Sequence, residues 1–308
     1  MFRPFSIVSA AALVAALISN PAQALQRAFV ASYGNDANTA TNCLLGNPCR
    51  GFAAAMTVVD PGGEIVALDA AGYAAVTITK SVTITANPGF YAGISVASGT
   101  GVNIATPGVV VTLRGLNING FGGSTGVNMS NGTRLSIENC VISNFGPAYG
   151  VYVSAPATVR IVDSLIRDNN YGVVIAGAAT ANIMGSKILG NAIAGVMVYS
   201  GTASAVASAT ITDSTLAKND INVYAFETIA SALSRIIVIR SSMTNGSYGV
   251  RSTFNGGPTF ISVSDSLISG NSVGFAQEGA GATVESLGNN TARVNGPDVG
   301  TVTTVALR

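Results

Sequence analysis

The side chains that could carry acid–base or metal chemistry are few and scattered along the chain. The 308 residues include 15 Lys and Arg, 14 Asp and Glu and no histidine, so histidine bases and histidine metal ligands are excluded. The best-spaced acids are Asp163, Asp213 and Asp265, which recur at one position of a repeat. A bend residue that bonds its own backbone explains each of them better than a metal ligand does. We therefore predict no catalytic residue, no metal site and no cofactor.

A second group consists of Arg114, Glu138 and Arg160, at neighbouring outward positions of the same repeat. Two arginines beside a carboxylate could hold the carboxylate of an acidic sugar next to an acid. A surface ion-pair ladder, which contributes roughly 0–1 kcal/mol, explains the same three residues. We favour the ladder and keep the three residues as a candidate binding group.

A third group is an outward column in the strand that follows a recurring glycine. Aromatic and apolar side chains stand in it, and these could bind a polysaccharide or a cell-surface partner. The alternative is that a loop or a partner strand covers this column. Its members are Asn128, Tyr152, Val174, Met197, Tyr224, Arg251 and Ala276, of which Tyr152, Val174, Met197 and Tyr224 are the candidate binding residues.

These groups are positioned by a repeat whose clearest copy is residues 159–175. Val159 and Ile161 alternate with outward residues, Asp163 and Ser164 bend the chain, and a second bend at residues 167–172 precedes another short strand. Equivalent fourth positions fall at residues 116, 140, 164, 186, 214, 242 and 266, with spacings of 24, 24, 22, 28, 28 and 24. A period in the range of roughly 20–50 residues is typical of solenoids and propellers, and strands this short favour a solenoid.

The repeat predicts columns of stacked residues, each pairing with its equivalent one coil later. Two inward columns are expected: Leu113, Ile137, Ile161, Ile183, Ile211, Ile239 and Val263; and Ile118, Ile142, Ile166, Ile188, Leu216 and Ile268, with Thr244 as an exception. Asn169, Asn191, Asn219 and Asn271 predict an asparagine ladder in a bend. A glycine column follows it, at Gly150, Gly172, Gly195, Gly249 and Gly274, with Asn222 in one copy; we attribute it to a backbone conformation that a Cβ would resist.

This pattern of alternating apolar residues, Asp-Ser, Asn and Gly resembles the repeat of the pectin-lyase-like superfamily. The resemblance covers residues 64–287 and implies an all-β, right-handed, single-stranded parallel β-helix. The superfamily includes polysaccharide lyases, hydrolases, epimerases and adhesins. The resemblance therefore implies a fold and leaves the activity open.

The repeats are expected to lie between two closing segments. Residues 25–63 should form an N-terminal cap, in which Asn47 caps a short helix, Pro48 occupies its first position, and Phe52 and Met56 face the core. A Cys43–Cys49 disulfide is expected in this cap, whereas Cys140 is expected to be a buried thiol. Residues 288–308 depart from the repeat and are expected to close the C-terminal end.

Residues 1–24 have the charged start, apolar run and Ala22-Gln23-Ala24 site of a cleaved signal peptide, which predicts an extracellular or periplasmic protein. The later chain has no apolar run long enough to span a membrane. Without Arg3 the chain has 14 basic and 14 acidic residues, which gives no basic surface for nucleic acid. We therefore expect a secreted surface, carbohydrate-interacting or structural module without evident catalysis. A polysaccharide lyase or a related carbohydrate-active enzyme is the alternative.

Overall fold

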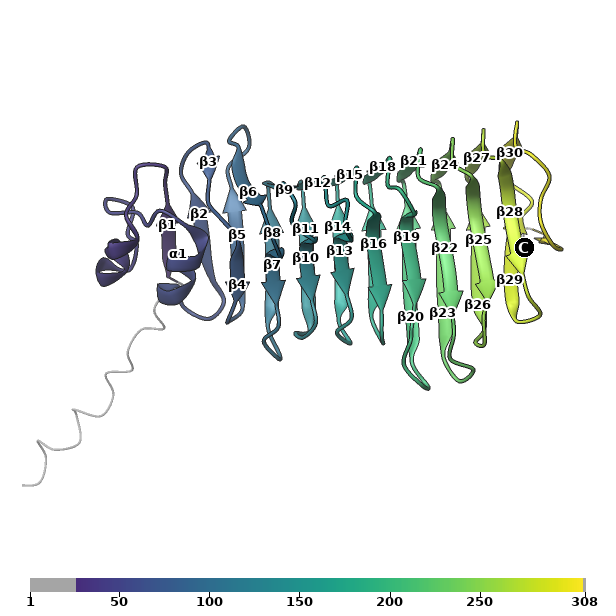
Figure 1. Cartoon of the computed structure of the whole chain (residues 1–308), viewed down its shortest axis with the longest axis horizontal. Helices are drawn as coiled ribbons and strands as arrows, with labels where there is room; N and C mark the ends of the chain where they lie inside the picture. Colours follow the sequence, from purple (N-terminus) through teal and green to yellow (C-terminus); the bar gives the residue numbers. More distant parts are fainter. Residues whose placement is uncertain (1–25, 307–308) are drawn as a thin grey trace, which may run out of the picture.

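Short runs of alternating burial form the strands, as in β14 (Thr158–Val162), where Val159 and Ile161 are buried. The structure, a computed structural model, describes residues 26–306. Its strands lie in three parallel sheets, and successive coils of the chain supply neighbouring strands of each sheet (Figure 1). One of the sheets has nine strands, which correspond to about nine coils, so the predicted parallel β-helix is confirmed.

The three sheets differ in length. Sheet A contains twelve strands: β1 (Arg27–Val30), β2 (Gly63–Ala67), β5 (Val82–Ala86), β8 (Val110–Arg114), β11 (Arg134–Glu138), β14, β17 (Thr180–Met184), β20 (Val206–Thr212), β23 (Leu233–Ile239), β26 (Thr259–Ser264), β29 (Ala282–Leu287) and β31 (Thr303–Val305). Sheet B contains ten: β3 (Ala71–Gly72), β6 (Ala92–Val96), β9 (Leu116–Gly120), β12 (Val141–Ser143), β15 (Leu165–Arg167), β18 (Lys187–Leu189), β21 (Thr215–Ala217), β24 (Ser242–Thr244), β27 (Leu267–Ser269) and β30 (Thr291–Arg293). Sheet C contains nine: β4 (Val76–Ile78), β7 (Thr100–Ile104), β10 (Thr125–Met129), β13 (Tyr149–Val153), β16 (Tyr171–Ala176), β19 (Ala194–Tyr199), β22 (Ile221–Glu227), β25 (Tyr248–Phe254) and β28 (Val273–Glu278).

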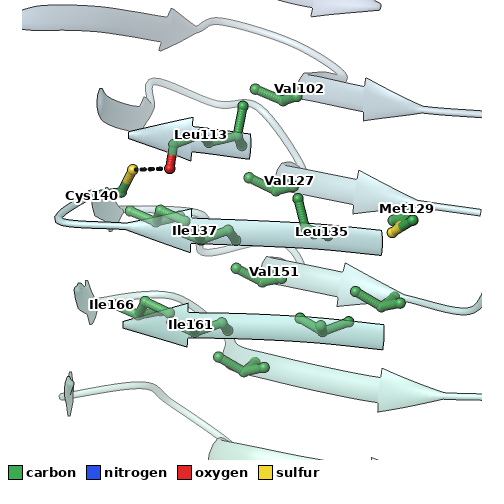
Figure 2. Packing of buried hydrophobic residues seen from close by; sticks show 14 of the residues in the cluster. Val102, Leu113, Val127, Met129, Leu135, Ile137, Cys140, Val151, Ile161 and Ile166 are labelled. Carbon is green, nitrogen blue, oxygen red and sulfur yellow. Dashed lines mark hydrogen bonds between the residues drawn. The ribbon is translucent and has the colours of Figure 1, made fainter. Parts of the chain in front are cut away.

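The core is a stack of apolar columns that run through the coils (Figure 2). Ile137, Ile161, Ile183 and Ile211 pair in succession, and all four are fully buried. Stacking equivalent β-branched side chains in this way fills the interior at the density of a protein core. Cys140 lies in the same core with its thiol directed at the carbonyl of Leu113, 3.5 Å away (Figure 2).

The predicted columns are wrong by one residue in the coil of β23 and β24. Ile211 pairs with Val238, and Ile239 stands outward next to it. Leu216 likewise pairs with Met243, which is fully buried, so Thr244 is no exception in the inward column. The spacing between these coils is therefore 27 residues, as the bond from the Ser214 N–H to Ser241 Oγ shows.

Two polar ladders hold the bends of the coils. The first ladder consists of the serines at 164, 186, 214 and 241. Each serine hydroxyl donates to the backbone carbonyl two residues before it. Each hydroxyl oxygen also accepts from a backbone N–H of the preceding coil, as Ser186 Oγ does from the N–H of Ser164 at 3.2 Å. The predicted asparagine ladder is present: Asn169 Nδ2 donates to Asn191 Oδ1 at 3.0 Å, and Asn191 donates to Asn219 at 2.8 Å. These bonds satisfy buried polar groups that the bends would otherwise leave unpaired.

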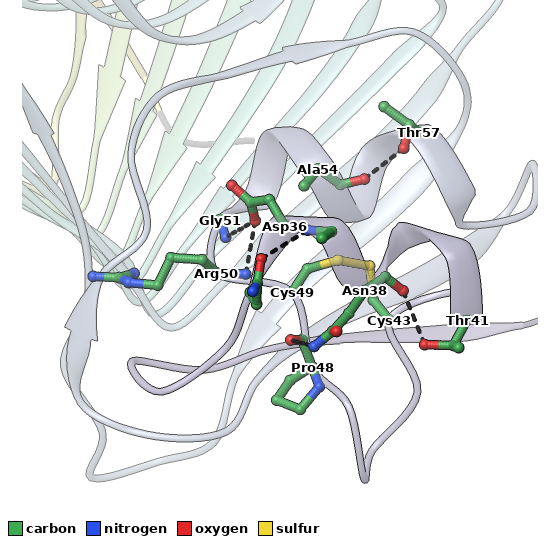
Figure 3. Close-up of a disulfide and its surroundings, with 12 residues drawn as sticks. Asp36, Asn38, Thr41, Cys43, Pro48, Cys49, Arg50, Gly51, Ala54 and Thr57 are labelled. Carbon is green, nitrogen blue, oxygen red and sulfur yellow. Dashed lines mark hydrogen bonds between the residues drawn. A yellow bond between two sulfur atoms is a disulfide. The ribbon is translucent and has the colours of Figure 1, made fainter.

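An N-terminal cap covers one end of the solenoid with η1 (Asp36–Thr41) and α1 (Phe52–Val58) (Figure 1). The predicted start of α1 at Asn47 and Pro48 is wrong, because Cys49 instead exchanges backbone bonds with β1. The carboxylate of Asp36 accepts the N–H groups of Arg50 and Gly51, which fixes the bend before the helix (Figure 3). A disulfide joins Cys43 to Cys49 beside this bend.

At the other end, residues 288–306 continue the coil with β30 and β31, which extend sheets B and A. Asn295 adds a step to the asparagine ladder by accepting from Asn271 at 3.1 Å. Val302 packs against the core, while Val299 forms an isolated bridge to Ala276. Within residues 26–306, none of the helices is long and apolar enough to cross a membrane. The predicted signal peptide lies outside the described residues.

Candidate functional site

The outward column of sheet C has the register expected from the sequence. Tyr152, Val174, Met197 and Tyr224 pair in succession across β13, β16, β19 and β22. Tyr152, Met197 and Tyr224 are partly exposed, whereas Val174 is only 1% exposed. The Tyr152 hydroxyl lies 3.1 Å from the hydroxyl of Tyr199. Tyr199 belongs to β19, one coil beyond the strand β16 that contains Val174. The side chain of Tyr152 therefore extends past the coil of β16 toward β19.

At the glycine column the alternation of buried and outward residues is interrupted, which brings further aromatic residues to this face. Tyr149 and Tyr152 are three residues apart, yet their rings stack with centroids 4.7 Å apart. Both residues on the inner side between them, Gly150 and Val151, are buried. A Cβ at Gly150 would lie 2.7 Å from the carbonyl oxygen of Gly172, so the glycine is needed for close approach to the next coil. The φ angle of Gly150 is not positive, so the expected unusual backbone conformation is wrong. The glycines of this column are needed because the next coil packs closely against them.

The result is one continuous aromatic surface, here called the tyrosine face. Six of the nine tyrosines contribute to it, from five consecutive strands of sheet C. Its members are Tyr149, Tyr152, Tyr171, Tyr199, Tyr224, Phe226 and Tyr248. We predicted two of them from the column pattern. The others carried a signal that column counting missed, since Tyr-Gly recurs at 149–150, 171–172 and 248–249.

A shallow hollow of about 200 Å³, here called the trough, lies within the tyrosine face. Its floor is Val174 and Met197, with Tyr149 and Tyr171 on one side and Tyr199 and Phe226 on the other. Burial raises the pKa of the hydroxyls of Tyr171 and Tyr199, and for Tyr199 the bond to Tyr152 adds to the increase. The hydroxyls stay protonated, so the trough offers apolar surface bordered by neutral hydrogen-bonding groups.

A paired charge closes the C-terminal end of the tyrosine face. The Arg251 guanidinium donates through Nε and Nη2 to Glu278 Oε2 at 3.1 and 2.8 Å. It also lies over the rings of Tyr248 and Tyr224, 4.6 and 5.5 Å from their centroids. Burial opposes the charge on Arg251, but the bond to Glu278 raises the pKa of Arg251. The ion pair therefore keeps this end of the face close to neutral.

The structure also brings Arg114, Glu138 and Arg160 together, on the outward side of sheet A. Glu138 lies 3.0 Å from Arg114 Nη2 and 3.4 Å from Arg160 Nη1. The hydroxyl of Ser136 donates to Glu138 and, with the two arginines, holds the pKa of Glu138 below its usual value despite partial burial. This is the geometry of a surface ion-pair ladder, in which the carboxylate stays ionised and its oxygens are occupied.

A larger hollow of about 770 Å³ begins at Arg114 and extends toward the N-terminal cap. The Arg27–Glu64 ion pair, with 2.8 Å between nitrogen and oxygen, borders it, and the loop at residues 87–90 lines it. Column counting could not reveal this hollow, because its residues come from the cap, from the loop at 87–90 and from several successive strands of sheet A. It offers polar and apolar surface, and both ion pairs at its border are already formed.

The aspartate column serves the bends. Asp163, Asp213 and Asp265 have positive φ values of 48°, 52° and 49°, and each is the first of the two residues between a strand of sheet A and a strand of sheet B. Arg240 binds both carboxylate oxygens of Asp213, at 2.8 and 2.9 Å. Over residues 26–306, no three His, Cys, Asp or Glu side chains converge into a group that could hold a metal ion.

Comparisons with known proteins agree with this architecture. Residues 92–292 match the profile of the right handed beta helix region. The structure is similar to that of pectate lyase Pel9A, with a TM-score of 0.60 and 16% identity, over 90% of this chain and 79% of that one. It is also similar to the A-module of the mannuronan C-5 epimerase AlgE4 from Azotobacter vinelandii, with a TM-score of 0.38 and 11% identity, over 80% of this chain and 89% of that one.

A search of curated protein sequences finds no significant match. At these identities, the likeness to the pectate lyase is a likeness of fold. The profile match covers well over half of the chain and coincides with the coils from β6 to β30. The chain belongs to the family of right-handed β-helix proteins.

Proposed function

We propose that this protein binds glycans through the tyrosine face and acts as a non-catalytic surface module. The observation that carries the proposal is the concentration of six tyrosines and Phe226 on one outward face, around the trough. Aromatic rings present flat apolar surface that the C–H faces of a sugar can cover, and tyrosine hydroxyls can bond sugar hydroxyls. The fold likeness to a pectate lyase is consistent with a polysaccharide partner.

The place of action that we propose is outside the cytoplasm, after removal of residues 1–24. The Cys43–Cys49 disulfide supports an oxidising compartment. The sequence features of a signal peptide support export, although they lie outside the described residues. Intact-mass measurement of the exported protein should place its first residue at Leu25.

The second candidate is a polysaccharide lyase or a related enzyme that acts at Arg114, Glu138 and Arg160. The hollow that begins at Arg114 favours it, since that hollow has the size of an ordinary ligand site. The lowered pKa of Glu138 weighs against it, because a strongly ionised, fully bonded carboxylate is a weak proton acceptor. Arg114 and Arg160 are likewise engaged with that carboxylate.

Binding to a panel of immobilised polysaccharides tests the proposal. The wild type should be retained, and the double variant Tyr152→Ser with Tyr224→Ser should lose retention while staying folded, as its circular dichroism spectrum shows. Tyr33→Ser is the matched control, because Tyr33 is 72% exposed on the cap, away from the tyrosine face. Unchanged retention of the double variant would show that the tyrosine face is not the site.

A parallel assay separates the two candidates. The purified protein is incubated with pectic and alginate polymers, with and without calcium, and new unsaturated sugar ends are measured. We expect none. Product formation that disappears in Glu138→Gln would establish the enzyme and reject the non-catalytic module.

A further inference from the structure

The shape and charge of the trough indicate which glycans can occupy it. We infer that the ligand of the tyrosine face is an uncharged, extended glycan that lies along the long axis of the solenoid. This inference rests on the proposed function and specifies its substrate class.

The direction follows from the arrangement of the trough. Its floor and walls come from the four successive strands β13, β16, β19 and β22, so it is elongated across the coils. Tyr171 precedes Val174 in β16 and Tyr199 follows Met197 in β19, which places the two aromatic walls on opposite sides of the floor. A chain lying between these walls runs from one coil to the next.

The spacing of the coils favours an extended chain. Neighbouring parallel strands lie about 4.8 Å apart, which is close to the advance of one pyranose residue in an extended β-linked glycan. Each sugar can therefore meet the same kind of surface as the one before it. A helical or sharply bent glycan loses this register after one or two residues. Asn103 and Asn128 continue the column of Tyr152, with an amide–amide bond of 3.0 Å, and supply neutral hydrogen-bonding groups at its N-terminal end.

The charges around the trough favour a neutral ligand. All six residues that line it are uncharged. The neighbouring cation, Arg251, is bound to Glu278 by two hydrogen bonds. A uronic acid polymer carries one carboxylate per residue, and each would be desolvated against aromatic rings without a free cation. Such a polymer therefore meets a penalty that a neutral chain avoids.

Intrinsic tyrosine fluorescence measures this binding directly. The chain contains no tryptophan, and six of its nine tyrosines lie on the tyrosine face. The probes are cellohexaose and mannohexaose as neutral extended chains, maltohexaose as a neutral bent chain, and hexamers of galacturonate and mannuronate as anionic chains. The neutral extended probes should bind at least about tenfold more tightly than the other three, with affinities that do not change between low and high salt.

Variants sharpen the test. Tyr171→Ala with Tyr199→Ala should abolish the binding of cellohexaose, whereas Tyr171→Phe, which keeps the ring, should retain it. Glu278→Gln frees the charge of Arg251 beside the tyrosine face, so this variant should gain salt-sensitive affinity for the anionic hexamers. Thermal midpoints of each variant, measured in parallel, show that its fold is kept.

The possible outcomes distinguish the two proposals. Preferential, salt-sensitive binding of anionic hexamers by the wild type would overturn the inference and leave the glycan-binding function standing. Equal affinity for maltohexaose would overturn the extended geometry. Binding of no glycan, together with self-association that Tyr171→Ala and Tyr199→Ala abolish, would overturn both proposals and make a second copy of this chain the occupant.

Discussion

Glu227 is a fully buried carboxylate that organises two of the longer connections between sheets C and A. Five donors converge on it with distances between 2.8 and 3.3 Å: the N–H groups of Ser200, Gly201, Thr228 and Ile229, and the hydroxyl of Ser234. A buried carboxylate is tolerated when its lone pairs are filled in this way. The bonds to Glu227 therefore tie the connection at residues 200–205 to the connection at residues 228–232.

Truncation of Glu227 should therefore be costly. Glu227→Ala leaves several buried donors without a partner, at roughly 1–3 kcal/mol each, so we expect a loss of about 3 kcal/mol or more in unfolding free energy. Glu227→Gln keeps one acceptor oxygen and should lose less. Urea denaturation measures both, with Glu285→Ala at a partly exposed position as the control. Equal losses for Glu227→Ala and Glu285→Ala would contradict this role.

Cys140 makes the stability of the protein sensitive to alkaline pH. Burial raises the pKa of its thiol from 9.0 to about 11. Between these values the folded state holds a proton that the unfolded state has lost, so stability falls as pH rises from 9 to 11. A shift of this size corresponds to about 3 kcal/mol at most.

Cys140→Ala should remove this contribution. Urea midpoints measured at pH values between 9 and 11 should fall less steeply in the variant than in the wild type. Tyr199 and Tyr224, which are partly buried and whose pKa values are also raised, lower the stability of both proteins equally over this pH range. Parallel declines in the two proteins would show that the thiol is not the source.

At the scale of the coil, an asparagine and a glycine have exchanged places between the glycine column and the asparagine column of two neighbouring coils. Asn222 occupies the glycine column in β22, and Gly246 occupies the asparagine column in the next coil. The Asn222 amide accepts from Asn219 at 2.9 Å and donates to Asn271 at 3.1 Å, so it bridges the step that Gly246 leaves open. A Cβ at Gly246 would lie 2.9 Å from the Asn222 amide nitrogen. Each departure from the repeat therefore compensates for the other.

A double-mutant cycle tests this compensation. Asn222→Gly breaks the ladder and Gly246→Asn crowds the Asn222 amide, so each variant alone should be destabilised. The double variant restores the repeat seen in other coils, and we expect it to recover at least about 1 kcal/mol relative to the sum of the two single losses. Denaturant midpoints provide the four values. Additive losses would mean that the two positions are independent.

The repeat allowed the fold and most columns to be predicted. A one-residue shift in a β-strand would turn its apolar side chains outward, so the apolar pattern fixes the register. Ile161 and Ile183 could be assigned on that ground. The error at Ile239 arose where Ser241 and Ser242 are adjacent and either serine satisfies the pattern. A tertiary contact, the bond from Ser214 to Ser241, decides between them, and the sequence does not contain that information.

The members of the tyrosine face were harder to predict from the sequence, because not all of them follow the two-residue period of a strand. The column of Tyr152 and Tyr224 follows strict pairing and was predicted. Tyr149 reaches the same face because Gly150 and Val151 are both buried, so the outward residues here are three apart and not two. Periodicity alone therefore places Tyr149 on the wrong side.

At the scale of the whole molecule, the two ends of the solenoid are closed unequally. At the N-terminal end, α1 buries Phe52 and Met56 against the first coil, and the Cys43–Cys49 disulfide fixes the preceding segment. At the C-terminal end, all three residues of β30 are exposed, and β31 is partly or fully exposed along its length. Coils in a solenoid contact mainly their neighbours, so such a difference remains local.

Hydrogen exchange should reveal this inequality. Because opening a central coil breaks contacts on both sides whereas opening a terminal coil breaks them on one, we expect β30 and β31 to exchange first and β13–β23 last. Replacing Cys43 and Cys49 by serine should accelerate exchange in β1, β2 and β5 and leave β25 and β28 unchanged, since loss of the disulfide loosens the cap alone. Peptide-resolved mass spectrometry measures both effects. Exchange of all strands at one rate would show that the solenoid opens as a single unit, and the capped end would then have no separate stabilising role.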